Sequence, residues 1–159
     1  MQVLGHVSQR VSELHDAGYV HRHLKPGNIL WQPRTHAWVL IDFGLAARIN
    51  RTARVACGTP PYAAPETAAA LQRRQRTTTA EAAIDAWAMG VIAFELLLQR
   101  PAFGPFMSVD QVRLQKQPFH VYFIGASCMY VCLPPRCFLG VSVMMGELRL
   151  LPDMSREQS

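Results

Sequence analysis

The stretch YVHRHLKPGNIL, residues 19–30, lies between a predicted helix and a predicted pair of strands. Upstream, four apolar residues recur at spacings of three and four, which places them on one face of a helix: Leu4, Val7, Val11 and Leu14. Gly18 suits the left-handed position that ends such a helix. Downstream, the apolar runs NILW and AWVLI enclose the turn-like QPRTH and predict an antiparallel β-hairpin. The stretch is therefore expected to be a loop that joins the helix to the hairpin.

Farther along the chain, residues 42–66 contain Gly, Pro, Thr and Arg without a sustained period, which predicts a long loop of the kind that is usually functional. Thr78 and Glu81 have the spacing of a capping box in front of a second helix. Between residues 82 and 98 the only charged residues are Asp85 and Glu95, so this helix should be buried. A buried Asp85 needs hydrogen-bond donors, because an unpaired carboxylate in a core is strongly unfavourable.

The composition favours one domain with a hydrophobic core, since the chain has 159 residues and 50% of them are apolar. The formal net charge is +5, a mild excess that specifies no partner by itself. Arginines recur in residues 48–54 and 73–76, but no aromatic interleaving and no nucleic-acid motif accompanies them. A solvated polar face is therefore favoured, and no nucleic-acid partner is expected.

The C-terminal part of the chain, residues 118–159, is more apolar than the rest. Its run FHVYFIGASCMYVCL is shorter than the roughly 20 residues of a membrane-spanning helix. Pro134 and Pro135 then interrupt the pattern. We expect no membrane span, although contact of residues 119–146 with a membrane stays open. The N-terminus MQVLGHVSQR lacks the features of a signal peptide, so a cytoplasmic location is the default.

Several short motifs follow one another in order: HRHLKPGN at 21–28, DFG at 42–44, GTPPY at 58–62, APE at 64–66 and DAWAMGV at 85–91. This ordered set resembles the large, mostly helical lobe of a eukaryotic protein kinase over about residues 3–106. The lysine followed by proline, together with GTPPY, resembles the serine/threonine branch of the family. The resemblance implies a mainly α fold: the helical C-terminal lobe with a small β-hairpin and without the N-terminal lobe.

The family transfers a phosphoryl group from ATP to Ser or Thr of proteins, with Mg²⁺ holding the triphosphate. The resemblance implies that Asn28 and Asp42 hold Mg²⁺ through an amide oxygen and a carboxylate, and that they bind ATP together with Lys25. Lys25 would also be catalytic, because it neutralises the transferring phosphoryl. The family's catalytic aspartate falls on His23, which is therefore a candidate catalytic residue that lacks the negative charge. General-base assistance is worth about 10²–10⁴-fold, and we expect a loss near the upper end.

Other residues take structural roles that the resemblance implies. Phe43 would pack in the internal hydrophobic spine, and Asp85 would accept hydrogen bonds from the backbone of the HRHLKPGN loop. Glu66 would pair with an arginine, but the sequence offers no convincing partner. Arg22 would clasp a phosphate on the activation loop, for which Thr52 is a substitute acceptor.

The chain also departs from the family. No glycine-rich loop and no lysine-bearing strand precede the first helix, so we expect weak nucleotide binding at best. Residues 1–117 are predicted to be a partial kinase domain, and residues 118–159 an unrelated apolar tail that is poorly ordered. Three interpretations stay open: a kinase whose remaining parts lie outside this chain, a pseudokinase-like scaffold, and a truncated gene product without a function of its own. The sequence does not indicate which protein is the substrate or partner.

Overall fold

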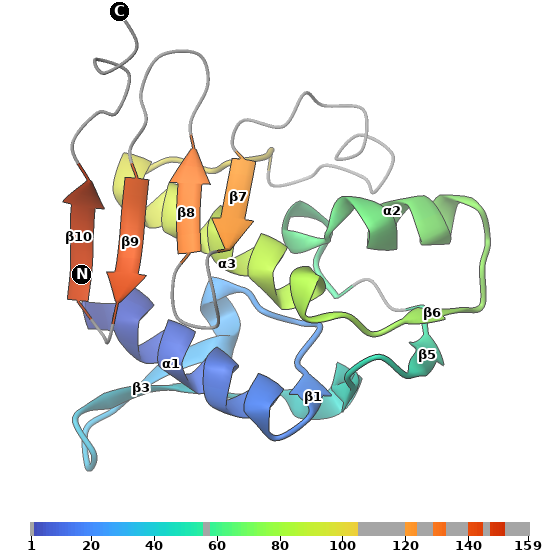
Figure 1. Cartoon of the computed structure of the whole chain (residues 1–159), viewed down its shortest axis with the longest axis horizontal. Helices are drawn as coiled ribbons and strands as arrows, with labels where there is room; N and C mark the ends of the chain where they lie inside the picture. Colours follow the sequence, from blue (N-terminus) through green and yellow to red (C-terminus); the bar gives the residue numbers. More distant parts are fainter. Residues whose placement is uncertain are drawn as a thin grey trace, which may run out of the picture.

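The computed structural model describes residues 2–55 and 58–104 and the backbone of four later strands (Figure 1). In chain order the elements are α1 (Gln2–Asp16), β1 (Tyr19–Val20), β2 (Ile29–Gln32), β3 (Ala37–Leu40), β4 (Ala47–Arg48), β5 (Thr52–Arg54), α2 (Pro65–Gln72), β6 (Thr77–Thr79), α3 (Ala82–Leu98), β7 (His120–Phe123), β8 (Met129–Cys132), β9 (Gly140–Met144) and β10 (Glu147–Leu151). Short 3₁₀ turns cover Pro26–Asn28, Phe43–Leu45 and Pro60–Tyr62.

The main core forms where α1 packs against α3. The predicted apolar face of α1 is confirmed, since Leu4, Val7 and Val11 are buried in the same cluster as Val91 and Phe94 of α3. α1 ends at Asp16, and Gly18 follows with φ +85°, a conformation that disfavours a side chain. α3 covers the predicted residues, and its apolar face is buried as expected.

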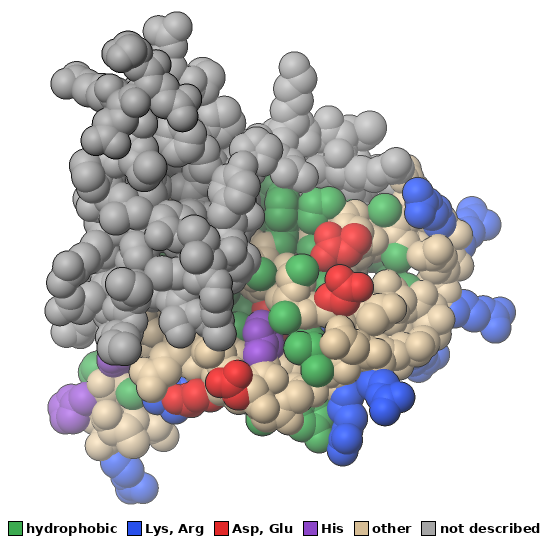
Figure 2. Space-filling view, viewed as in Figure 1, with side chains coloured by type: hydrophobic (Ala, Val, Ile, Leu, Met, Phe, Trp, Pro, Cys, Tyr) green, Lys and Arg blue, Asp and Glu red, His purple; other side chains and the backbone are tan. Residues whose placement is uncertain are grey.

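Short two-stranded sheets surround this core. The predicted hairpin is confirmed as β2 paired with β3, with Ile29 opposite Leu40. The segment 42–66 is not the structureless loop that its composition predicts, because it contains β4, paired with β1, and β5, paired with β6. In this segment the pairing partners lie outside the local sequence, so no local period marks the strands. Figure 2 shows Lys and Arg side chains along the edge of the molecule where α2, β5 and β6 lie.

The predicted capping box is wrong. α3 begins at Ala82 with Glu81 at the N-cap position, and no side chain caps the helix there. Thr78 belongs to β6 instead and is paired with Ala53 of β5. Tertiary pairing of a β-branched residue has thus taken precedence over a local capping signal.

Four strands, β7 to β10, lie within residues 118–159 and are drawn next to one another in Figure 1. β7 pairs with β8, and β9 pairs with β10, both antiparallel. Because short strands accompany the three described helices, a mainly α fold is not confirmed; the elements are those of a partial kinase fold. The predicted boundary at residue 117 stays a prediction. Within the described residues, no helix combines the length and apolar character required to cross a bilayer.

Candidate active site

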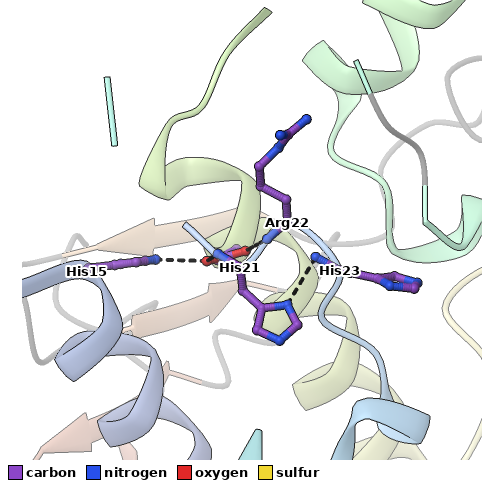
Figure 3. A network of polar contacts seen from close by, with 5 residues as sticks. His15, His21, Arg22 and His23 are labelled. Atoms are coloured by element: carbon purple, nitrogen blue, oxygen red, sulfur yellow. Dashed lines mark hydrogen bonds and ion pairs between the residues drawn. The ribbon is translucent and has the colours of Figure 1, made fainter. Parts of the chain in front are cut away.

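The carboxylate of Asp85 binds the backbone of the HRHLKPGN loop, residues 21–28. Its side chain is fully buried on α3, and it accepts hydrogen bonds from the backbone N–H groups of His21 and Arg22, each at 2.7 Å. The expected contact between Asp85 and the loop backbone is therefore confirmed. His15, near the end of α1, places its Nε2 2.9 Å from the same carboxylate (Figure 3). The sequence did not predict this third contact, because His15 and Asp85 are 70 residues apart and no local sequence pattern relates them.

Backbone strain marks both sides of the candidate site. Arg22 has φ 67° and Asp42 has φ 64°, in the left-handed region that residues with a side chain rarely adopt. Such conformations cost about 1–3 kcal/mol each and persist only where the surroundings enforce them. For Arg22 the enforcing contact is the Asp85 carboxylate. Asp42 is one of the residues that the kinase resemblance identifies as functional, and Arg22 directly precedes another, His23.

Three of the four predicted site residues meet at one point. His23 Nδ1 lies 3.1 Å from Oδ2 of Asp42. Asn28 donates through Nδ2 to the His23 carbonyl at 2.8 Å and lies 3.4 Å from the same Asp42 oxygen. The Asp42 side chain is 46% exposed, whereas that of His23 is only 15% exposed. A carboxylate that is open to solvent thus has an imidazole and an amide as its nearest side-chain neighbours.

The fourth predicted residue, Lys25, is on the same loop but does not join this cluster. No ion pair or side-chain hydrogen bond of its ammonium group is found among residues 2–55 and 58–104. Its carbonyl accepts the N–H of Asn28 at 2.9 Å, which helps to form the turn at Pro26–Asn28. Lys25 therefore helps to position Asn28, and the expected binding of an anion by its ammonium group stays a prediction.

Gly58, the first residue of the GTPPY segment, packs directly on the imidazole of His23. A Cβ at this position would lie only 2.0 Å from His23 Cδ2, so no larger residue fits without moving the ring. The sequence analysis missed this role, because a glycine in a Gly- and Pro-containing loop reads locally as a turn residue. The close contact fixes His23 between the GTPPY segment and Asp42.

His21 is a structural residue under the loop. Its Nε2 lies 3.0 Å from the Ile41 carbonyl, and its Nδ1 accepts the N–H of His23 at 3.2 Å. Burial lowers the pKa of His21, although the nearby charge of Asp85 opposes the shift. The ring of Phe43 contacts that of His21 in a tilted arrangement, with a centroid distance of 4.9 Å, yet Phe43 is 49% exposed. The expectation that Phe43 packs in an internal hydrophobic spine is therefore wrong, because half of its surface is exposed.

The side chain of Arg22 binds protein carbonyls. Its guanidinium donates to the Leu45 carbonyl at 3.3 Å and to the Arg54 carbonyl. Burial lowers its pKa from the usual value. Both acceptors belong to the segment between DFG and APE, so Arg22 holds this segment to the HRHLKPGN loop through backbone oxygens.

Thr52, the predicted substitute phosphosite, is exposed on β5.

Tyr62 and Glu95 connect the GTPPY segment to α3. The Tyr62 hydroxyl donates to Glu95 Oε2 at 2.8 Å. Burial raises the pKa of Tyr62 above its ordinary value of 10.0, and the hydrogen bond to Glu95 raises it further. A raised pKa means that the folded state favours the neutral phenol, so this contribution to stability is full below about pH 10 and is lost as the pH rises further.

Replacing Tyr62 by phenylalanine should lower the free energy of unfolding by about 1 kcal/mol at neutral pH, because the Glu95 carboxylate loses a hydrogen-bond donor. It should also flatten the decline in stability above about pH 10. Urea unfolding at several pH values measures both effects. Tyr19→Phe is the matched control, because Tyr19 is an exposed tyrosine outside this contact. Equal stability and equal pH profiles for the two variants would contradict the assignment.

The donor atoms for a metal ion are hard oxygens. Asp42 offers a carboxylate and Asn28 an amide oxygen, the ligand types that Mg²⁺ prefers, although the Asn28 atom that lies 3.4 Å from Asp42 is the amide nitrogen Nδ2. Within the described residues, no group of three or more His, Cys, Asp or Glu side chains is arranged to hold a metal. The chemistry of Asn28 and Asp42 is compatible with Mg²⁺, and their role as its ligands stays a prediction.

These features are those of the helical lobe of a protein kinase. A buried aspartate supports a loop that carries lysine and asparagine, and the asparagine lies next to the aspartate of the DFG motif. The protein kinase domain family matches residues 1–124, and the chain belongs to this family. The sequence-based resemblance is confirmed at this level.

Curated relatives agree with the assignment. Serine/threonine-protein kinase H2 of Homo sapiens is 37% identical over 123 residues, which cover 74% of this chain and 29% of that protein. Serine/threonine-protein kinase CG17528 of Drosophila melanogaster is 35% identical over 120 residues, 73% of this chain and 14% of that protein. Citron rho-interacting kinase of Rattus norvegicus is 41% identical over 96 residues, 58% of this chain and 5% of that protein. The chain thus spans less than a third of the length of these relatives.

Proposed function

We propose that this chain is the C-terminal lobe of a cytoplasmic serine/threonine-type protein kinase in which phosphoryl transfer to protein is strongly impaired. The observation that carries the proposal is the 3.1 Å contact between His23 Nδ1 and Asp42 Oδ2. His23 stands where the family has a catalytic carboxylate. An imidazole carries no negative charge in either protonation state, so it brings none toward the acceptor hydroxyl, and its Nδ1 lies 3.1 Å from Asp42 Oδ2.

In this proposal Asn28 and Asp42 hold Mg²⁺, and Lys25 binds the phosphates of ATP. When bound, the metal ion neutralises the charge of the triphosphate. Asn28 is kept in place by the His23 carbonyl, and the Asp42 carboxylate is contacted by His23 Nδ1 and Asn28 Nδ2. His23 contacts Oδ2 of the Asp42 carboxylate and so competes with a cation for this group, which favours weak binding of metal and nucleotide.

A fluorescent ATP analogue tests this site in the chain as it stands. With Mg²⁺ present, we expect weak binding that Asp42→Ala reduces by about tenfold or more, because a hard cation loses its charged ligand. Asp16→Ala is the control, since Asp16 is an exposed carboxylate at the end of α1. Binding that is undetectable in the unmodified chain, or that is equally strong in the Asp42 and Asp16 variants, would refute the metal and nucleotide site.

A pseudokinase-like scaffold is the second candidate, and the contacts of Arg22 favour it. Arg22 fixes the segment between DFG and APE through the carbonyls of Leu45 and Arg54, so that segment keeps its conformation without a phosphate. A surface that is ordered in this way can bind a partner without any transfer reaction. A truncated product without function would show neither nucleotide binding nor partner binding.

A further inference from the structure

An exposed row of arginines lies on the side of the molecule formed by α2, β5 and β6 (Figure 2). We call this surface the arginine edge, and its members are Arg51, Arg54, Arg73, Arg74 and Arg76. All five side chains are exposed. In the sequence they form two groups about twenty residues apart, which by themselves predict two solvated loops.

The pairing of β5 with β6 brings the two groups together. Arg54 lies opposite Thr77, and the N–H of Val55 donates to the Arg76 carbonyl at 3.0 Å. At the other end of the pair, the N–H of Ala80 donates to the Arg51 carbonyl, also at 3.0 Å. The backbone therefore places Arg51 and Arg54 of the first group beside Arg76 of the second along one short sheet, and Arg73 and Arg74 lie in the turn between α2 and β6.

In the part of the chain that the structure describes, the charges of this edge have no acidic partner in an ion pair. None of the five arginines forms an ion pair within residues 2–55 and 58–104. Glu66 is in the first turn of α2, whereas Arg73 follows the last turn, so the helix separates them. Glu81 lies beyond β6, and its charge adds to the partial burial that raises the pKa of Glu66. Clustered guanidinium groups of this kind attract anions and bind carboxylates or phosphates in a bidentate manner.

We propose that the arginine edge binds an acidic segment of a partner protein. The side chains between the arginines are hydroxyls and amides, including the exposed Thr52, Thr77 and Gln75. No exposed large apolar residue lies on β5 or β6, so the described edge offers neither a stacking platform for bases nor an apolar anchor for a bilayer. In the described part, β5 and β6 form a two-stranded sheet, and an extended peptide can add to the edge of a sheet through backbone hydrogen bonds.

This interaction uses no residue of the candidate active site, so it is separable from ATP binding. The test uses fluorescence anisotropy of labelled peptides with the whole chain. One peptide alternates Glu with Gly, a second has Gln for each Glu, and a third has phosphoserine for each Glu. The edge variant is Arg73→Gln, Arg74→Gln and Arg76→Gln. The control variant removes the same charge elsewhere, at Arg10, Arg34 and Arg100, each changed to Gln.

We expect the Glu peptide to bind in a salt-dependent manner, the Gln peptide not to bind, and the edge variant to weaken binding by about tenfold or more while the control changes it little. Binding of the phosphoserine peptide supports the same proposal, and the tighter of the two identifies the preferred anion. An equal loss in both variants would mean unspecific attraction and would overturn it. Tighter binding to phosphatidylserine vesicles or a DNA duplex, lost in the edge variant, would overturn the assignment to a protein partner.

Both variants are checked by thermal unfolding. If the edge variant unfolds, Arg51→Gln with Arg54→Gln takes its place, with Arg10→Gln and Arg34→Gln as the control. The same criteria then apply. Nucleotide binding in the same preparations separates a failure here from a failure of the proposed function.

Discussion

Replacing Asp85 by asparagine should destabilise the protein by about 3–5 kcal/mol, a large share of the roughly 5–15 kcal/mol that stabilises a typical domain. The Asp85 carboxylate is fully buried, and it accepts hydrogen bonds from the N–H groups of His21 and Arg22 while His15 contacts it as well. An asparagine has one acceptor oxygen, so at least one buried donor would face an NH₂ group. The loss also removes the contact that holds Arg22 at φ 67°.

Urea unfolding followed by far-UV circular dichroism measures the effect. Asp16→Asn is the matched control, because it makes the same chemical change at an exposed position in α1. His15→Gln should cost less than Asp85→Asn, since the two backbone contacts remain. If Asp85→Asn were as stable as Asp16→Asn, the buried carboxylate would not be what supports the loop.

The Asp85 network also shows how far sequence reasoning reaches. The charge-poor helix around Asp85 predicted both the burial and the need for donors, and the kinase resemblance located two of them. His15 was not predicted, because its partner lies 70 residues away and only the packing of α1 against α3 brings them together. Local periodicity describes one element at a time, whereas this contact depends on two.

The same reason explains the errors around residues 42–80. β5 and β6 are short and polar, and each is a strand only because the other is present. The sequence therefore indicated a loop and a capping box there, and it indicated two separate groups of arginines. In the candidate site, ordered motifs identified His23, Asn28 and Asp42 as neighbours. They did not indicate the imidazole contact with Asp42 or the close approach of Gly58.

Changing His23 to aspartate should raise phosphoryl transfer from Mg²⁺-ATP to a protein substrate by about 10²–10⁴-fold over the unmodified chain. The change restores a carboxylate at the position where the family orients the acceptor hydroxyl and accepts its proton. It also frees Asp42 from the imidazole that now lies 3.1 Å away. Radiolabelled phosphate transfer to a mixed serine- and threonine-containing protein substrate measures the gain.

A second readout does not depend on activity. Two carboxylates within a few ångströms repel each other, so without metal the aspartate variant should unfold at a lower temperature than the unmodified chain. Added Mg²⁺ should reverse this difference, because a cation between the two carboxylates stabilises the folded state by mass action. His23→Asn is the control that removes the imidazole without adding charge. Equal transfer rates for the asparagine and aspartate variants would show that release of Asp42, and not the carboxylate, limits the reaction. No gain in either variant would place the impairment outside position 23 and would refute the role that we propose for His23.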